Sequence, residues 1–151
     1  MSRLTLYPMG ASEVMLAGEF SNLFKVELIK SQLSIFKEKK LIATIGLNHF
    51  EGKYAFKGTQ LKIKNRLSTI EIKGYELGDI LISTSLSKKW CEPLSLNVFL
   101  NQKKIAYFRA SSKYVFFDKK YDLIYNKSCD FDFIVMLLVY LHNAVTDLST
   151  P

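Results

Sequence analysis

The chain has 151 residues and a mass of 17.4 kDa, a length that accommodates one compact domain and leaves no room for a second hydrophobic core. Hydrophobic residues make up 48% of the sequence, enough material to bury such a core, so disorder as the main state is excluded. There are 21 basic and 14 acidic residues, and the formal net charge is +7. With only two histidines and two cysteines, the chain has little material for metal or nucleophile chemistry.

The positive charge is carried almost entirely by lysine, because Arg3, Arg66 and Arg109 are the only arginines. This weakens the case for sequence-specific nucleic-acid binding, since reading guanine relies on the bidentate guanidinium of arginine. The surplus peaks between Lys88 and Lys127 and is absent from the C-terminal segment. A negatively charged partner would therefore be steered towards the region before residue 128.

The cysteines and the apolar runs bear on the compartment. Cys91 and Cys129 stand alone, without metal-ligand spacing or an even disulfide framework, which favours a reducing compartment. Met1–Gly10 has no apolar run of signal-peptide length. The longest apolar run, Phe133–Leu141, is about half of what a bilayer core of roughly 30 Å requires. We therefore expect a cytoplasmic protein without a transmembrane helix.

Alternation of apolar and polar residues runs through most of the chain before residue 128 and predicts about ten to twelve short strands between residues 2 and 126. The segments that carry it are Leu4–Leu6, Val14–Leu16, Phe24–Leu28, Leu33–Ile35, Leu41–Leu47, Tyr54–Lys57, Leu61–Arg66, Ile70–Lys73, Ile80–Ile82, Leu94–Leu100, Lys103–Arg109, Tyr114–Phe117 and Tyr121–Tyr125. Ser83–Pro93, which holds Trp90, predicts a loop or an irregular edge.

Two of the predicted hairpins resemble each other weakly, and an internal repeat is one interpretation. Phe36, Lys39, Lys40, Ile42 and Ala43 correspond to Phe99, Lys103, Lys104, Ile105 and Ala106 when one residue is inserted. These residue types are common, so the similarity does not by itself establish a repeat.

The periodicity changes at Asp130, where Asp130 or Ser128 fits the N-cap of a helix over about 130–148. Phe133–Leu141 is apolar on every side, so this helix must be enclosed on all faces. Enclosure by the preceding strands would satisfy both halves of the chain and leave few open sheet edges. We therefore predict a single mainly β domain over residues 1–151, a closed antiparallel β-barrel of about twelve strands around a hydrophobic C-terminal helix.

The C-terminal half also carries a family resemblance. Its elements are Lys103–Phe108, Phe116–Asp118, Lys120–Leu123, and Asp130 with the apolar helix that follows. This pattern resembles tubby C-terminal-like domains, and most of all the LURP-one-related and small bacterial tubby-like proteins, in a superfamily that includes the phospholipid scramblases. The resemblance covers residues 94–148 and implies a barrel of about twelve strands around a hydrophobic helix. It further implies binding of phosphoinositide headgroups through basic side chains on the barrel wall, although Lys62, Lys64 and Arg66 do not align with those ligands.

The clearest candidate binding residues are Lys62, Lys64 and Arg66, which share one face of a predicted strand within about 14 Å, at roughly 3.4 Å per residue. Such a face suits an anionic lipid surface or a phosphorylated ligand. Lys103, Lys104, Lys119 and Lys120 bracket two predicted turns and would extend the patch if the turns point the same way. The alternative is a solvated face with lysines that protect a sheet edge.

Catalytic chemistry is not expected. Asp118, Asp122, Asp130 and Asp132 match no calcium loop and are predicted to be helix caps and surface acids, and His49 and His142 to be structural. There is no glycine-rich phosphate loop, nucleophile elbow or metal-binding histidine pair. We therefore expect no enzyme, no cofactor and no metal.

Two functional hypotheses remain. The first is a non-enzymatic cytoplasmic binding protein, peripheral at the inner face of the membrane, that docks on anionic lipid or a phosphorylated ligand through basic residues of the wall. The second is a protein-protein interaction module, such as a bacterial immunity or stress-response factor, that uses Trp90 and nearby loops. A ligand inside the barrel is disfavoured because the helix should occupy the interior.

Overall fold

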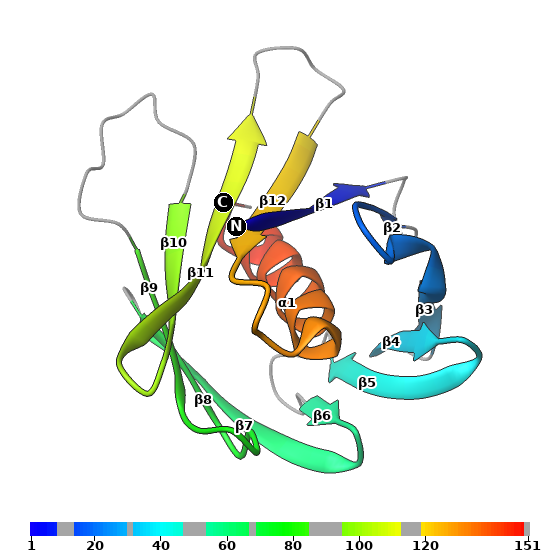
Figure 1. Ribbon diagram of the computed structural model, residues 1–151. Helices are drawn as coiled ribbons and strands as arrows, with labels where there is room; N and C mark the ends of the chain where they lie inside the picture. The colour runs from blue at the N-terminus through cyan, green and yellow to red at the C-terminus, as the bar shows by residue number, and fades with distance from the viewer. Residues whose placement is uncertain are drawn as a thin grey trace.

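The computed structural model of the chain describes residues 1–8, 14–29, 32–46, 54–66, 69–84, 95–112 and 119–149 (Figure 1). Within these ranges the strands are β1 (Ser2–Pro8), β2 (Val14–Ala17), β3 (Phe24–Ile29), β4 (Gln32–Lys37), β5 (Lys40–Gly46), β6 (Tyr54–Phe56), β7 (Thr59–Asn65), β8 (Thr69–Lys73), β9 (Ile80–Thr84), β10 (Ser95–Leu100), β11 (Lys103–Ser112) and β12 (Lys119–Tyr125). A 3-10 helix, η1 (Ser21–Leu23), precedes β3, and an α-helix, α1 (Phe131–Ser149), follows β12.

The strands form one antiparallel sheet that curls into a nearly closed barrel around α1 (Figure 1). Their order is β2-β1-β12-β11-β10-β9-β8-β7-β6-β5-β4-β3, so β12 pairs with β1 and every other pairing joins strands consecutive in the chain. This confirms the predicted mainly β barrel of about twelve strands with a C-terminal helix. Within the described sheet, closure is incomplete between β2 and β3, which form its two ends and do not pair with each other.

Helix α1 fills the interior of the barrel. Each residue of Phe133–Leu141 is at most 5% exposed, which is the enclosure on all faces that the apolar run demands. Its N-terminus is capped by Asp130, whose Oδ1 accepts a hydrogen bond from the backbone N of Asp132 at 3.2 Å. Phe133 stacks on Tyr75 with ring centroids 3.7 Å apart, which ties the helix to the segment between β8 and β9.

The boundaries of one predicted loop differ from the structure. β9 continues to Thr84, so Ser83 belongs to the strand and not to the loop predicted over Ser83–Pro93. Ser83 pairs with Thr69 on one side and with Asn97 on the other, so two flanking strands extend β9 beyond its apolar residues. The rest of that loop, and the predicted strand Tyr114–Phe117, lie outside the described residues.

The hairpins β4–β5 and β10–β11 share their turn and their irregularity. Both turns have positive φ at two successive residues, 49° and 69° at Glu38 and Lys39, and 48° and 71° at Asn101 and Gln102. In both, the register shifts just before a phenylalanine, Phe36 or Phe99. Phe36 to Ala43 therefore matches Phe99 to Ala106 without a gap, which corrects the one-residue insertion assumed from the sequence.

A candidate basic wall on the barrel

The predicted basic face lies on the outside of β7. Lys62 and Lys64 of β7 and Arg66, just after its last residue, are exposed, whereas Leu61 lies in the core and Ile63 packs against it. This is the alternation that the sequence indicated. The adjacent strand β8 adds Lys73, which is exposed and lies directly opposite Lys62. Like charges placed opposite each other repel, so this pair favours a negatively charged partner over an empty surface.

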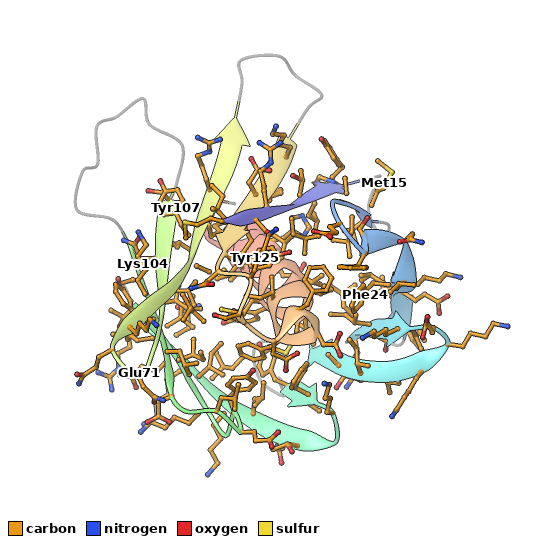
Figure 2. All side chains as sticks on the ribbon, in the orientation of Figure 1. Met15, Phe24, Glu71, Lys104, Tyr107 and Tyr125 are labelled. Carbon is orange, nitrogen blue, oxygen red and sulfur yellow. The ribbon has the colours of Figure 1, made fainter. Side chains whose placement is uncertain are left out.

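The strand register extends this face around the barrel. Lys64 pairs with Glu71, Glu71 with Leu81, Leu81 with Phe99, and Phe99 with Lys104, so these residues form one outward row across β7–β11. Four steps of about 4.8 Å between neighbouring strands separate the two lysines by roughly 19 Å along the sheet. Figure 2 shows Glu71 and Lys104 on the outer side of this part of the barrel.

We call the outward cations of β7, β8 and β11, with the row between them, the basic wall. Its cations are Lys62, Lys64, Arg66, Lys73, Lys104 and Arg109. Leu81, 40% exposed, sits near the middle of the row, and the ammonium of Lys104 lies 5.2 Å from the ring centroid of Tyr107. The wall therefore combines positive charge with an exposed leucine and half-buried aromatic side chains, the composition of an interfacial binding site.

The acid Asp122 on β12 pairs with Arg109 and so offsets one cation of the wall. It is 0% exposed, which corrects the prediction of a surface acid. The register places Thr5 and Arg109 on either side of it. Thr5 Oγ1 donates a hydrogen bond to Oδ1 at 2.6 Å, and Arg109 Nη2 lies 3.7 Å from Oδ2.

The other candidate lysines from the sequence do not lie together on one surface. Lys104 joins the basic wall, but Lys103 instead lines a cavity of about 380 Å³ at the end of the barrel where α1 begins. Successive residues of a strand point to opposite faces, so the side chains of Lys103 and Lys104 point to opposite faces of β11. Lys120 is half-buried on β12, and the side chain of Lys119 lies outside the described part of the chain.

The barrel-end cavity brings Tyr75, Cys129 and Asp130 close together. Tyr75 Oη donates to Asp130 Oδ2 at 3.4 Å, and Cys129 Sγ lies 4.0 Å from the backbone oxygen of Ile105. Burial raises the pKa of both the Tyr75 hydroxyl and the Cys129 thiol. A thiol held in its neutral form is a poor nucleophile.

A second buried acid organises the same end of the barrel. Asp132 is 8% exposed, again a correction to the predicted surface acid, and its two carboxylate oxygens meet lysines of different hairpins. Lys37 Nζ lies 3.1 Å from Oδ1 and Lys57 Nζ 3.2 Å from Oδ2. Burial lowers the pKa of Lys57, but the hydrogen bond to Asp132 and the nearby acids outweigh it, so the pKa lies above its ordinary value. Through these ion pairs Lys37 and Lys57 link the strands to the start of α1, so their ammonium groups are already engaged by Asp132.

The other candidates from the sequence either lie outside the described ranges or lie elsewhere in the structure. Trp90, Cys91, His49 and Asp118 lie outside the described residues. His142 is half-buried with its ring 4.7 Å from that of Tyr121, a structural setting. Across the ranges that the structure describes, no cluster of three potential metal ligands occurs.

Comparison with family models, with curated proteins and with solved structures finds no match for this chain. The resemblance to tubby-like proteins therefore stays a prediction, and the structure defines a class of fold: a nearly closed antiparallel barrel around a C-terminal helix. In the described part of the chain, no helix is both long enough and apolar enough to cross a bilayer.

Proposed function

We propose that this chain is a non-enzymatic binding protein that docks reversibly on an anionic membrane surface through the basic wall, as a peripheral protein of the inner face of the membrane. The observation that carries the proposal is the outward row in which exposed Leu81 lies between Lys64 and Lys104. Cations attract the lipid headgroups, and an apolar side chain between them enters the boundary of the acyl chains.

The magnitudes favour docking that is reversible and sensitive to salt. Each lysine or arginine near an anionic surface contributes about 1 kcal/mol, and the contribution is screened over a Debye length of about 8 Å at physiological ionic strength. Because a flat membrane touches only part of a convex barrel, a few of the wall cations act at once. The expected affinity is therefore moderate and depends on Lys62, Lys64 and Arg66 acting together.

The test is co-sedimentation with vesicles of phosphatidylcholine alone and with added phosphatidylserine, at low and at physiological salt. The wall variant carries Lys62→Gln, Lys64→Gln and Arg66→Gln. The matched control carries Lys39→Gln, Lys40→Gln and Lys127→Gln, which removes the same charge from exposed positions at the barrel end. We expect the wild type and the control to sediment with acidic vesicles at low salt and the wall variant to remain in solution.

Two outcomes would overturn the proposal. Failure of the wild type to bind acidic vesicles at low salt removes the membrane function, and equal losses in the two variants show that net charge alone is responsible. A further arm adds the soluble headgroup glycerophosphoserine in excess. If it releases the protein from the vesicles, the wall binds a single phosphorylated headgroup and not an extended surface.

A further inference from the structure

The barrel has an open seam between β2 and β3. Among the residues that the structure describes, β2 pairs only with β1 and β3 only with β4, so each of these two strands has an unpaired edge in the described sheet. A groove of about 720 Å³ runs between them, lined by Val14, Leu16, Phe24, Val26 and others. Figure 2 labels one residue on each side of this seam, Met15 on β2 and Phe24 on β3. An unpaired edge of this kind is a template for another strand.

The backbone of β3 directs hydrogen-bonding groups towards the seam. Glu38 N donates to Leu23 O at 3.0 Å, which sets the alternation of hydrogen bonds towards β4. Since alternate residues of a strand bond to opposite sides, Phe24, Val26 and Leu28 present their N–H and C=O groups to the seam. Apolar side chains accompany this edge, because Leu28 is 41% and Ile29 43% exposed.

The order of side chains along β3 indicates what it would pair with. Phe24, Lys25, Val26, Glu27 and Leu28 read as a self-complementary sequence centred on Val26. In an antiparallel pair of two such strands, Lys25 of each copy lies opposite Glu27 of the other, and Phe24 lies opposite Leu28. The Lys25–Glu27 pairs would be at positions without mutual hydrogen bonds, where opposing Cα atoms are only about 4.5 Å apart.

We propose that the β3 edge is the interface of a symmetric dimer, in which β3 of a second copy pairs antiparallel with it about Val26. Charge complementarity favours a second copy as the partner. In each copy Lys25 and Glu27 form an ion pair within one strand, with Lys25 Nζ 2.8 Å from Glu27 Oε1, and the dimer exchanges the two intrastrand pairs of its two copies for two pairs between copies. The arrangement closes on itself after two copies, because each barrel has one β3 edge.

This proposal is independent of membrane docking. The interface uses β3, whereas the basic wall uses β7–β11, and the two lie on different parts of the barrel (Figure 1). Loss of either function leaves the other measurable.

Sedimentation velocity from about 5 to about 500 µM tests the dimer, a range that spans the micromolar affinity expected of a short strand pairing. Three variants accompany the wild type. Lys25→Glu sets two acids opposite each other and Glu27→Lys sets two lysines opposite each other. Lys40→Glu, at an exposed site on β5, is a control with the same charge change as Lys25→Glu.

We expect the wild type and Lys40→Glu to dimerise with rising concentration. Each of the two seam variants should weaken dimerisation by about tenfold or more at low salt, since both cross-strand pairs change from attractive to repulsive. An equimolar mixture of Lys25→Glu and Glu27→Lys should dimerise again, because a mixed pair restores opposite charges at both positions.

The mixing experiment distinguishes a paired edge from general repulsion or misfolding. A wild type that stays monomeric at about 500 µM overturns the proposal, since even a weak strand pairing would populate at that concentration. So does a mixture that stays monomeric after each variant alone has shown the circular dichroism of the wild type. Equal disruption by Lys40→Glu would assign the effect to net charge and overturn it as well.

Discussion

The hydroxyl of Thr5 donates a 2.6 Å hydrogen bond to the carboxylate of Asp122, although the two residues are 117 positions apart in the chain. The bond links β1 to β12, which among the described strands is the one pairing between strands that are not consecutive in sequence. Asp122 is fully buried, and Arg109 Nη2, 3.7 Å from its second oxygen, supplies the compensating charge. The junction that turns an open meander into a barrel thus contains a buried polar contact.

Replacement of Asp122 by alanine should therefore lower the free energy of unfolding by about 2–3 kcal/mol, because it leaves Thr5 without its acceptor and Arg109 without its partner. Urea unfolding followed by circular dichroism measures the change. Glu71→Ala, at a less buried acid of the basic wall, is the control and should shift the value by less than about 0.5 kcal/mol. Equal effects of the two substitutions would contradict the structural role of Asp122.

Asp132→Asn should destabilise the fold by about 1–2 kcal/mol, because it removes the negative charge that pairs with both Lys37 and Lys57. The positive end of the helix dipole at the N-terminus of α1 also favours this same charge. The loss of stability is modest because the two lysine side chains are 37% and 49% exposed, so solvent screens their attraction to Asp132. Thermal unfolding at low and at high salt measures it, with Glu19→Gln as a control at an exposed acid. A cost that does not shrink as salt rises would argue against an ionic origin.

Gln102→Gly should raise the free energy of unfolding by about 1 kcal/mol. Gln102 has φ of 71°, a left-handed conformation that glycine adopts without the steric cost of a Cβ, and it would complete an Asn-Gly turn with Asn101. Gly58→Ala is the opposite case in another hairpin, with φ of 79° and no atom within 4 Å of the new Cβ, and should cost a similar amount through strain alone. Chemical denaturation of both variants checks the signs, and a stability decrease in Gln102→Gly would show that its side chain has contacts that outweigh the strain.

The Cys129 thiol should ionise at higher pH in the folded protein than in the unfolded chain, because burial raises its pKa. Lys103 opposes this shift, so Lys103→Gln should raise the pKa further. A group with a raised folded pKa contributes stability that is complete below its unfolded pKa and lost as pH rises through the folded pKa. The rate of iodoacetamide alkylation against pH, in a Cys91→Ser background with and without urea, locates both pKa values. Coinciding midpoints would contradict the burial of the thiol.

The local features of the fold were predictable because they depend on neighbours in the chain. Alternation at Lys62, Lys64 and Arg66 predicted their common outward face, and nine successive apolar residues in Phe133–Leu141 predicted an enclosed helix. Both follow from the geometry of a single strand or helix. The burial of Asp122 was missed, since an aspartate on a strand reads as a surface acid until its cross-strand neighbours are known.

The candidate site was only partly predictable for the same reason. Lys104 shares an outward row with Lys64 because three strands between them pair in one register, whereas Lys103, its neighbour in sequence, lines the barrel-end cavity. Both residues are lysines and adjacent in sequence, so residue type alone does not show which of them faces outward.

The strand-rich barrel, its hydrophobic helix and the basic face of β7 could be predicted from residue spacing, because spacing along one element decides which side chains share a side. The tertiary structure alone decided which cations form one wall, which acids are buried and where the barrel stays open. These depend on the register between strands and on how the sheet curves around α1, and both arise from hydrogen bonds and packing between residues far apart in the chain.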